Sequence, residues 1–224
     1  MHIVVINRNQ QEYVHPMQSA LNPHTPLFIF DRCEPVEGCH YKVNIEGEGF
    51  LAGRMRDIGA EGVDDDILFL DGDKVPTGNI VSDIEKLKTN YDCICYGVKG
   101  DLELSELREF MRADDVDGIV PWQKCHAPYS CGCYSCGMWL SRDAVSKVRE
   151  LNGGRIFHPD FDGTWGDEDN FLADELNFLG FRIGYSTHVR LSGAFSNPVS
   201  KLDDFAKNFM KRLELRKKLL GQEV

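Results

Sequence analysis

Runs of consecutive apolar residues recur along the chain, and a polar or charged residue follows most of them. Their length and their content of β-branched and aromatic residues are typical of buried strands. The pattern predicts strands at residues 3–6, 26–30, 67–70, 92–98, 118–120 and 181–185.

Between these runs, apolar residues recur at helical spacing. Ser82 and Glu85 have the form of a capping box and predict that a short helix starts at Ser82. Ser141 is expected to cap the helix that follows it, and Gly180 to end the helix before it. Further helices are predicted at residues 10–21, 47–62, 105–113, 141–151, 168–179 and 201–220.

Strands that alternate with helices through the first half of the chain need crossover connections, which make neighbouring strands parallel. We therefore expect one α/β domain with a mixed, mainly parallel sheet flanked by helices. This domain is placed at residues 1–200. Residues 201–224 are assigned to a basic amphipathic helix that packs on the domain or extends from it.

The composition is that of a globular protein, with 42% hydrophobic and 27% charged residues in a chain of 224. The formal net charge of −11 argues against a surface built for polyanions. No apolar run approaches the ~20 residues that span a bilayer. The first residues lack the basic and apolar regions of a secretory signal, so a cytoplasmic protein is expected.

Charged residues follow three of the predicted strands, as Arg8, Asp31 and the pair Asp71 and Asp73. Ligands of open α/β sheets bind outside the carboxyl ends of the strands. Two carboxylates separated by one residue can face a single divalent ion, and oxygen ligands suit Mg²⁺ or Mn²⁺. The alternative is a solvated turn, because Asp-Gly is a common turn dipeptide.

Four stretches occur in an order that resembles the nucleotide-sugar glycosyltransferases of the GT-A type. They are Arg-Asp-Ile-Gly at 56–59, Asp-Gly-Asp at 71–73 after an apolar strand, Cys-Gly-Met-Trp-Leu-Ser-Arg at 136–142 and Trp-Gly-Asp-Glu-Asp at 165–169. Asp57 stands where that family usually has Asn, and Asp167 replaces the second Gly of a Trp-Gly-Gly-Glu-Asp motif. The resemblance runs from residue 3 to about residue 195 and implies a GT-A, Rossmann-like fold.

The resemblance also implies roles for individual residues. Asp169 takes the place of the catalytic base, with Glu168 as a hydrogen-bonding partner of the acceptor, and a direct base implies inversion at the anomeric carbon. Donor binding falls to Arg8, Asp31, Arg56, Asp71 and Trp165. The metal ligands implied are Asp71, Asp73 and His188. A helix-dipole role for the acids at 167–169 and a strand-end role for His188 are the structural alternatives.

Four cysteines lie within twelve residues, and the glycine-rich stretch 153–163 is a candidate mobile lid. Four thiolates are enough for a structural Zn²⁺, whereas small buried thiols or disulfides are the alternatives. These cysteines are Cys125, Cys131, Cys133 and Cys136. The basic C-terminal helix is either a packed helix with a solvated face or a peripheral contact to a membrane or anionic acceptor.

The function expected from these features is metal-dependent transfer of a sugar from a UDP-sugar to a hydroxyl of a glycan, lipid, protein or modified nucleic acid. The alternatives are a non-catalytic carbohydrate- or nucleotide-binding module of the same fold and a sugar-phosphate nucleotidyltransferase. The short chain favours a bacterial or viral enzyme over a Golgi one. The acids at 64–66, 71, 73 and 167–169 are expected to cluster at the site, so a bound cation is needed before a diphosphate can enter.

Overall fold

The computed structural model describes residues 1–45, 47, 49, 51–98, 119–121, 136–163, 166–193 and 202–221. The strands are β1 (His2–Asn7), β2 (Leu27–Asp31), β3 (His40–Asn44), β4 (Ile67–Asp71), β5 (Val75–Pro76), β6 (Cys93–Val98), β7 (Ile119–Pro121), β8 (Gly137–Leu140) and β9 (Ile183–Ser192). The α-helices are α1 (Val14–Leu21), α2 (Ala52–Ala60), α3 (Ile80–Leu87), α5 (Arg142–Leu151), α6 (Glu168–Phe178) and α7 (Leu202–Leu219). Two short 3-10 helices are η1 (Gln11–Tyr13) and η3 (Pro159–Phe161).

The described strands form one mixed sheet in the order β3-β2-β1-β4-β8-β6-β9-β5, and β7 pairs with β9. Strands β3, β2, β1 and β4 run parallel to one another, whereas β8 lies antiparallel between β4 and β6. The expected α/β domain with a mixed sheet is confirmed. Its parallel part brings the carboxyl ends of β1, β2 and β4 to the same edge.

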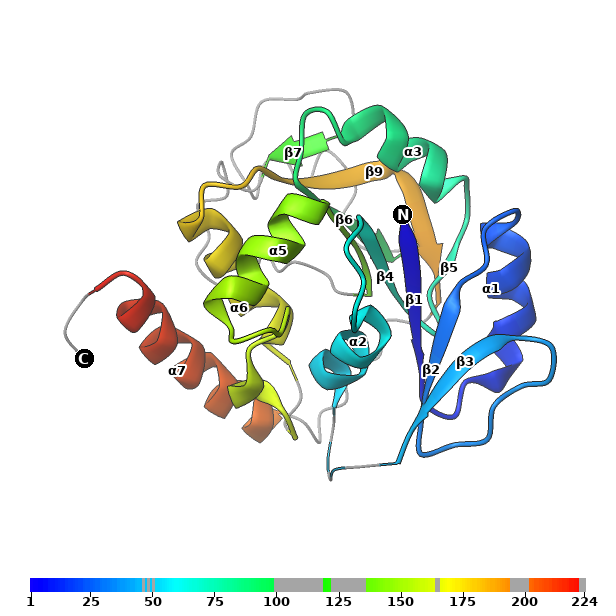
Figure 1. Ribbon diagram of the computed structural model, residues 1–224, viewed down its shortest axis with the longest axis horizontal. Helices are drawn as coiled ribbons and strands as arrows, with labels where there is room; N and C mark the ends of the chain where they lie inside the picture. Colours follow the sequence, from blue (N-terminus) through cyan, green and yellow to red (C-terminus); the bar gives the residue numbers. More distant parts are fainter. Residues whose placement is uncertain are drawn as a thin grey trace.

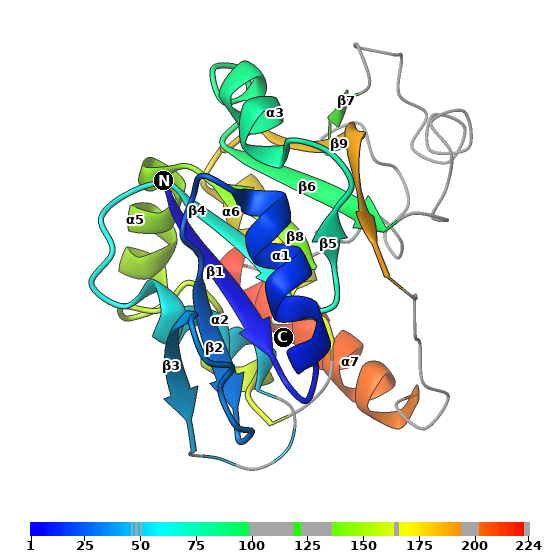
Figure 2. The same cartoon turned by 90° about the vertical axis from the view of Figure 1, so that its right-hand side faces the viewer.

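Helices cover both faces of this sheet (Figures 1 and 2). On one face, α2, α5 and α6 contribute Met55, Val145 and Leu172 to a core with the buried side of the strands. On the other face, α1 and α3 contribute Met17 and Ile84 to a second core. Strands β1, β2 and β4 are buried on both sides because of this layering, which explains their continuous apolar runs.

Local signals in the sequence set several element boundaries, and others differ from the prediction. Strand β9 runs to Ser192 instead of ending at residue 185, so His188 lies within the strand. Strand β5 was not predicted. Ser141 caps α5 as predicted, since its Oγ accepts a hydrogen bond from Ala144 N at 3.3 Å. Helix α3, however, begins at Ile80, and Asn79 Oδ1 caps it by accepting from Ser82 N at 2.9 Å. Edge strand β3 was not predicted, because most of its residues are exposed and carry no apolar run. The helix predicted at 105–113 lies outside the described residues.

The C-terminal helix α7 packs on α6, and half of its six basic side chains bind within the protein. Lys211 Nζ donates to Asp160 O, and Arg212 Nε donates to Asp174 Oδ2 at 2.7 Å. Arg216 Nη1 lies 3.7 Å from Asp174 Oδ1. These contacts leave Lys207, Lys217 and Lys218 on the exposed side of the helix. Of the helices in the described part of the chain, none has the length and apolar content to cross a bilayer.

Candidate functional site

The structure brings the predicted strand-end residues to one cavity of about 190 Å³. Register places Ile6 beside Asp71 and Asn7 beside Phe30, so the ends of the three strands are level. The cavity is lined by Ile6, Arg8, Gln10, Asp31, Leu51, Ala52, Met55, Asp71 and Asp73.

Asp31, the last residue of β2, lines this cavity and is almost fully buried. Its Oδ1 accepts from Asn44 Nδ2 at 3.0 Å and from Arg32 Nε at 3.1 Å. Its Oδ2 accepts from Arg32 Nη2 at 2.9 Å and lies 3.5 Å from Arg8 Nε. Arg32 adopts a left-handed backbone, with φ of 52°, and its Nη2 also donates to Gly49 O at 2.7 Å. Two arginines and Asn44 thus surround the buried Asp31 carboxylate.

The Asp-Gly-Asp turn at the end of β4 is packed against β1. A Cβ added to Gly72 would lie 2.9 Å from Ile6 O and from Asn7 Nδ2, so only glycine fits between the two aspartates. Asp71 and Asp73 both face the cavity, as the spacing predicts.

Arg56 of α2 links the two halves of the site. It is 2% exposed, its Nη2 donates to Asp71 Oδ1 at 2.7 Å, and its Nη1 donates to Glu168 Oε1 at 3.1 Å. The guanidinium carbon lies 5.4 Å from the centroid of the Phe157 ring, within cation–π range. A buried cation between two carboxylates therefore fixes the end of β4 relative to the start of α6.

Glu168 is also buried, and burial raises its pKa to about 7, with the neighbouring Asp169 adding to the rise and Arg56 opposing it. Asp169 is half-buried, and its Oδ1 accepts from Asn170 N at 2.8 Å. Both acids lie in the first turn of α6, where the helix dipole favours negative charge. Trp165 lies outside the described residues.

Asp167 precedes these acids in a left-handed conformation, with φ of 67°. This backbone explains why the resembling motif has glycine at the position. Here the aspartate side chain is held instead, since its Oδ1 accepts from Asn170 Nδ2 at 2.8 Å and lies 3.8 Å from Arg212 Nη1. Asn208 Nδ2 of α7 donates to Gly166 O at 2.9 Å. The C-terminal helix therefore supports the turn that carries Glu168.

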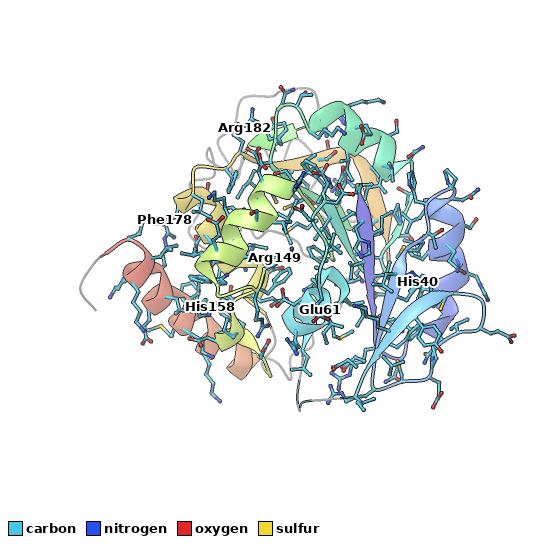
Figure 3. All side chains as sticks on the ribbon, viewed as in Figure 1. His40, Glu61, Arg149, His158, Phe178 and Arg182 are labelled. Atoms are coloured by element: carbon cyan, nitrogen blue, oxygen red, sulfur yellow. The ribbon has the colours of Figure 1, made fainter. Side chains whose placement is uncertain are left out.

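Asp57, which stands where the resembling motif has Asn, is explained by the residues that its carboxylate contacts. Its Oδ1 accepts from Ile156 N at 2.8 Å, and its Oδ2 accepts from Arg155 Nε at 2.8 Å. Arg155 also donates to both carboxylate oxygens of Asp162. A carboxylate rather than an amide at residue 57 suits this arginine. Arg155 thus ties the stretch 153–163, the predicted lid, to Asp57 of α2. The ring centroids of His158, in the same stretch (Figure 3), and of Phe171 lie 5.3 Å apart.

His188 does not join Asp71 and Asp73, contrary to the ligand set that the resemblance implied. Its Nδ1 lies 3.0 Å from Oδ1 of Asp83, a buried residue of α3 that also accepts from Tyr96 and Ser186. Within the described residues, no three His, Cys, Asp or Glu side chains gather closely enough to hold a metal ion. The bulge of β9 between residues 186 and 191 directs His188 toward α3 instead.

The acidic cluster expected at the site is also smaller than predicted. Asp64, Asp65 and Asp66 lie at the start of β4, at the opposite edge of the sheet. There Asp64 pairs with Arg142 at 2.6 Å, and Asp65 pairs with the N-terminal amine at 2.6 Å. At the site itself, four cations pair with four acids: Arg8, Arg32, Arg56 and Lys74 with Asp31, Asp71, Asp73 and Glu168.

Three residues of the candidate site were not predicted from the sequence: Lys74, Arg32 and Asn44. Lys74 is 8% exposed, and its Nζ donates to Asp73 Oδ2 at 2.7 Å. A buried lysine directly after the Asp-Gly-Asp turn was the available signal, but burial cannot be read from one residue in a polar stretch. Of the four clustered cysteines, only Cys136 lies in the described part of the chain, and its thiol lies 3.8 Å from Tyr96 O.

Comparison with known proteins places this arrangement in a known fold. No protein-family model matches the chain, and no curated protein is similar in sequence. TarS of S. aureus (residues 1–349) superposes with a TM-score of 0.63 at 12% identity, over 100% of this chain and 67% of that one. Mannosyltransferase PcManGT from Pyrobaculum calidifontis, solved with GDP-Man and Mn²⁺, gives a TM-score of 0.61 at 10% identity, over 95% and 64%.

GalNAc-T7, solved with UDP, GalNAc and Mn²⁺, gives a TM-score of 0.61 at 12% identity, over 93% of this chain and 47% of that one. The chain thus corresponds to about two thirds or less of each neighbour. These likenesses establish that the chain has the fold of GT-A glycosyltransferases, as the sequence predicts.

Proposed function

We propose that this chain is a glycosyltransferase that moves a sugar from a nucleotide-sugar, a UDP-sugar in the first instance, to an acceptor hydroxyl. The observation that carries the proposal is the convergence of Arg8, Asp31, Asp71 and Asp73 on one cavity at the carboxyl edge of the parallel strands. Ligands of open α/β sheets bind at this edge. The fold adds support, because neighbours that share it are glycosyltransferases solved with nucleotides or nucleotide-sugars.

In this proposal the nucleotide lies over β1 and β2. Asp31, oriented by Arg32 and Asn44, would accept hydrogen bonds from the base or ribose. The Arg8 side chain is 43% exposed at the cavity and lies 3.5 Å from Asp31, so it would reach a phosphate by exchanging this contact while Arg32 still binds Asp31. Arg56 would act through Asp71, because both of its terminal nitrogens already donate to carboxylates.

The residues at the end of β4 fit a divalent cation. Asp71 and Asp73 each give one carboxylate oxygen to an internal cation, and the other oxygen accepts no bond from the described residues. Mg²⁺ and Mn²⁺ commonly take one or two carboxylates and complete their shell with water and phosphate oxygens. When bound there, such an ion would neutralise the charge that develops on the diphosphate leaving group.

The acids at the start of α6 are proposed to act on the acceptor. Asp169 would take the proton from the attacking hydroxyl, and a direct base of this kind gives inversion at the anomeric carbon. Glu168 would contact the acceptor while Arg56 holds its Oε1.

The test combines binding and turnover. UDP, GDP and uridine are titrated with and without Mn²⁺, and UDP-sugars are then screened for hydrolysis. We expect UDP to bind and to be released from one sugar, and Asp73→Asn to abolish this release. Asp64→Asn is the matched control at the opposite end of β4. Asp169→Asn should bind UDP normally but lose turnover.

Three results would contradict the proposal in distinct ways. UDP binding without turnover of any UDP-sugar would indicate a binding module. Release of pyrophosphate from a nucleoside triphosphate and a sugar phosphate would indicate a nucleotidyltransferase. Normal sugar transfer by Asp169→Asn would remove Asp169 from the role of base.

A further inference from the structure

The two carboxylates at the end of β4 are neutralised by cations of different character. Asp71 is bound by Nη2 of Arg56, and Nη1 of the same guanidinium donates to a second carboxylate, Glu168. Asp73 is bound by Lys74, the residue that follows it in the sequence. The lysine ammonium is a compact point charge on a flexible stem. Displacing Arg56 from Asp71 would disturb a guanidinium that a second carboxylate also holds, whereas the Lys74 ammonium sits on a flexible stem.

Lys74 lies next to Gly193, the residue that follows β9. A Cβ added to Gly193 would lie 3.2 Å from Lys74 Nζ and 2.5 Å from Asp73 O. Gly193 has a φ of 140°, so the residue that closes over Lys74 is one whose backbone favours glycine. Lys74 does not line the cavity, while Asp73 does. Lys74 is 8% exposed, so its ammonium binds Asp73 from a largely buried position outside the lining of the cavity.

We propose that Lys74 and a divalent cation compete for the Asp73 carboxylate, so that the cation binds tightly only together with the phosphates of the nucleotide. This inference rests on the proposed function and adds an order of binding to it. A positive charge on one oxygen of Asp73 disfavours a second cation on the other, because like charges at that separation repel strongly in a partly buried site. The negative charges of a diphosphate offset this repulsion, so nucleotide and cation favour each other's binding.

The test measures binding of Mn²⁺ alone, by calorimetry and by the electron paramagnetic resonance signal of free Mn²⁺. Lys74→Met keeps an unbranched side chain that is one atom shorter and removes its charge. We expect it to bind Mn²⁺ at least about tenfold more tightly than the unmodified protein in the absence of nucleotide. Lys74→Arg, which keeps the charge, should resemble the unmodified protein. The matched control is Lys88→Met, which removes an exposed lysine that pairs with Glu85.

A second measurement locates the effect. Adding Asp73→Asn to Lys74→Met should abolish the gain in Mn²⁺ affinity, and saturating UDP should shrink the difference between Lys74→Met and the unmodified protein. Lys74→Gln serves as the neutral variant if Lys74→Met does not fold. Unchanged or weaker Mn²⁺ binding in the neutral variants overturns the competition.

This outcome is separable from failure of the proposed function. If the unmodified protein binds UDP with Mn²⁺ but neutral variants show no gain for Mn²⁺ alone, only the role of Lys74 is wrong. If no nucleotide binds under any condition, the proposed function is wrong, and the coupling to nucleotide falls with it.

Discussion

Arg56 Nη1 donates to Glu168 Oε1 at 3.1 Å and joins two residues that lie 112 positions apart in the chain. The same guanidinium holds Asp71 through Nη2. Asp71, which faces the cavity, and Glu168, at the start of α6, are thus both positioned by the buried Arg56. Site geometry and stability depend on the same side chain.

Replacing this cation should be costly. In Arg56→Met, two carboxylates lose their partner while Glu168 stays buried, and breaking a buried pair in this way typically lowers the free energy of unfolding by about 3–5 kcal/mol. Urea denaturation followed by circular dichroism measures the loss. Arg54→Met is the control, because Arg54 is an exposed residue of the same helix. A loss below about 1 kcal/mol in Arg56→Met would show that the link is not a stabilising one.

Asp57→Asn converts the helix signature to the residue usual in the resembling family, and here it should destabilise. The amide oxygen can still accept from Ile156 N, but the amide nitrogen then faces Arg155 Nε and cannot accept from it. We expect a loss of about 1–3 kcal/mol, the range for an arginine bond to a charged acceptor. A double-mutant cycle with Arg155→Met checks the cause. Fully additive losses would mean that the two residues do not interact.

Much of the site edge could be predicted from the sequence because strand ends are local features. Apolar runs of four or five residues mark β1, β2 and β4, and the charged residues that follow them meet wherever the strands are parallel. Asp31 and Asp71 converge for this reason alone.

The remaining features depend on distances that a linear pattern does not contain. His188 was expected at the metal, but the bulge in β9 turns it to Asp83. The acids at 64–66 and the Asp71–Asp73 pair are neighbours in sequence, yet the length of β4 separates them. The charge of the site was overestimated because the pairing of Asp73 by Lys74 and of Asp71 by Arg56 is visible only in three dimensions.

The C-terminal helix should support catalysis from a distance. In Arg212→Met, Asp174 loses the cation that it shares with Asp167, and the turn before Glu168 loses part of its support. We expect a loss of about 3–5 kcal/mol in the free energy of unfolding. At temperatures where the variant stays folded, turnover of the donor should fall while the affinity for UDP is retained. Lys217→Met, on the exposed side of α7, is the control and should change stability by less than about 0.5 kcal/mol.

The pH dependence of stability should carry the signature of Glu175. This residue of α6 is 1% exposed, and burial raises its pKa from the ordinary 4.5 to about 8, with the nearby Asp174 adding to the rise. In the folded protein Glu175 therefore keeps its proton at neutral pH, whereas in the unfolded chain it ionises above about pH 4.5. Because the unfolded state then binds fewer protons, stability falls as the pH rises from about 5 to about 8 and levels off above that.

Glu175→Gln keeps the shape of the side chain and removes this ionisation. The fall in the free energy of unfolding between pH 5.5 and pH 8 should be smaller than in the unmodified protein by about 1–3 kcal/mol. Urea denaturation at both pH values measures it. Glu168 contributes a fall of the same sign in both proteins, so the difference between them isolates Glu175. Glu61→Gln, at the exposed end of α2 (Figure 3), is the control and should leave the dependence unchanged. An equal fall in Glu175→Gln and in the unmodified protein would mean that Glu175 is ionised in the folded state.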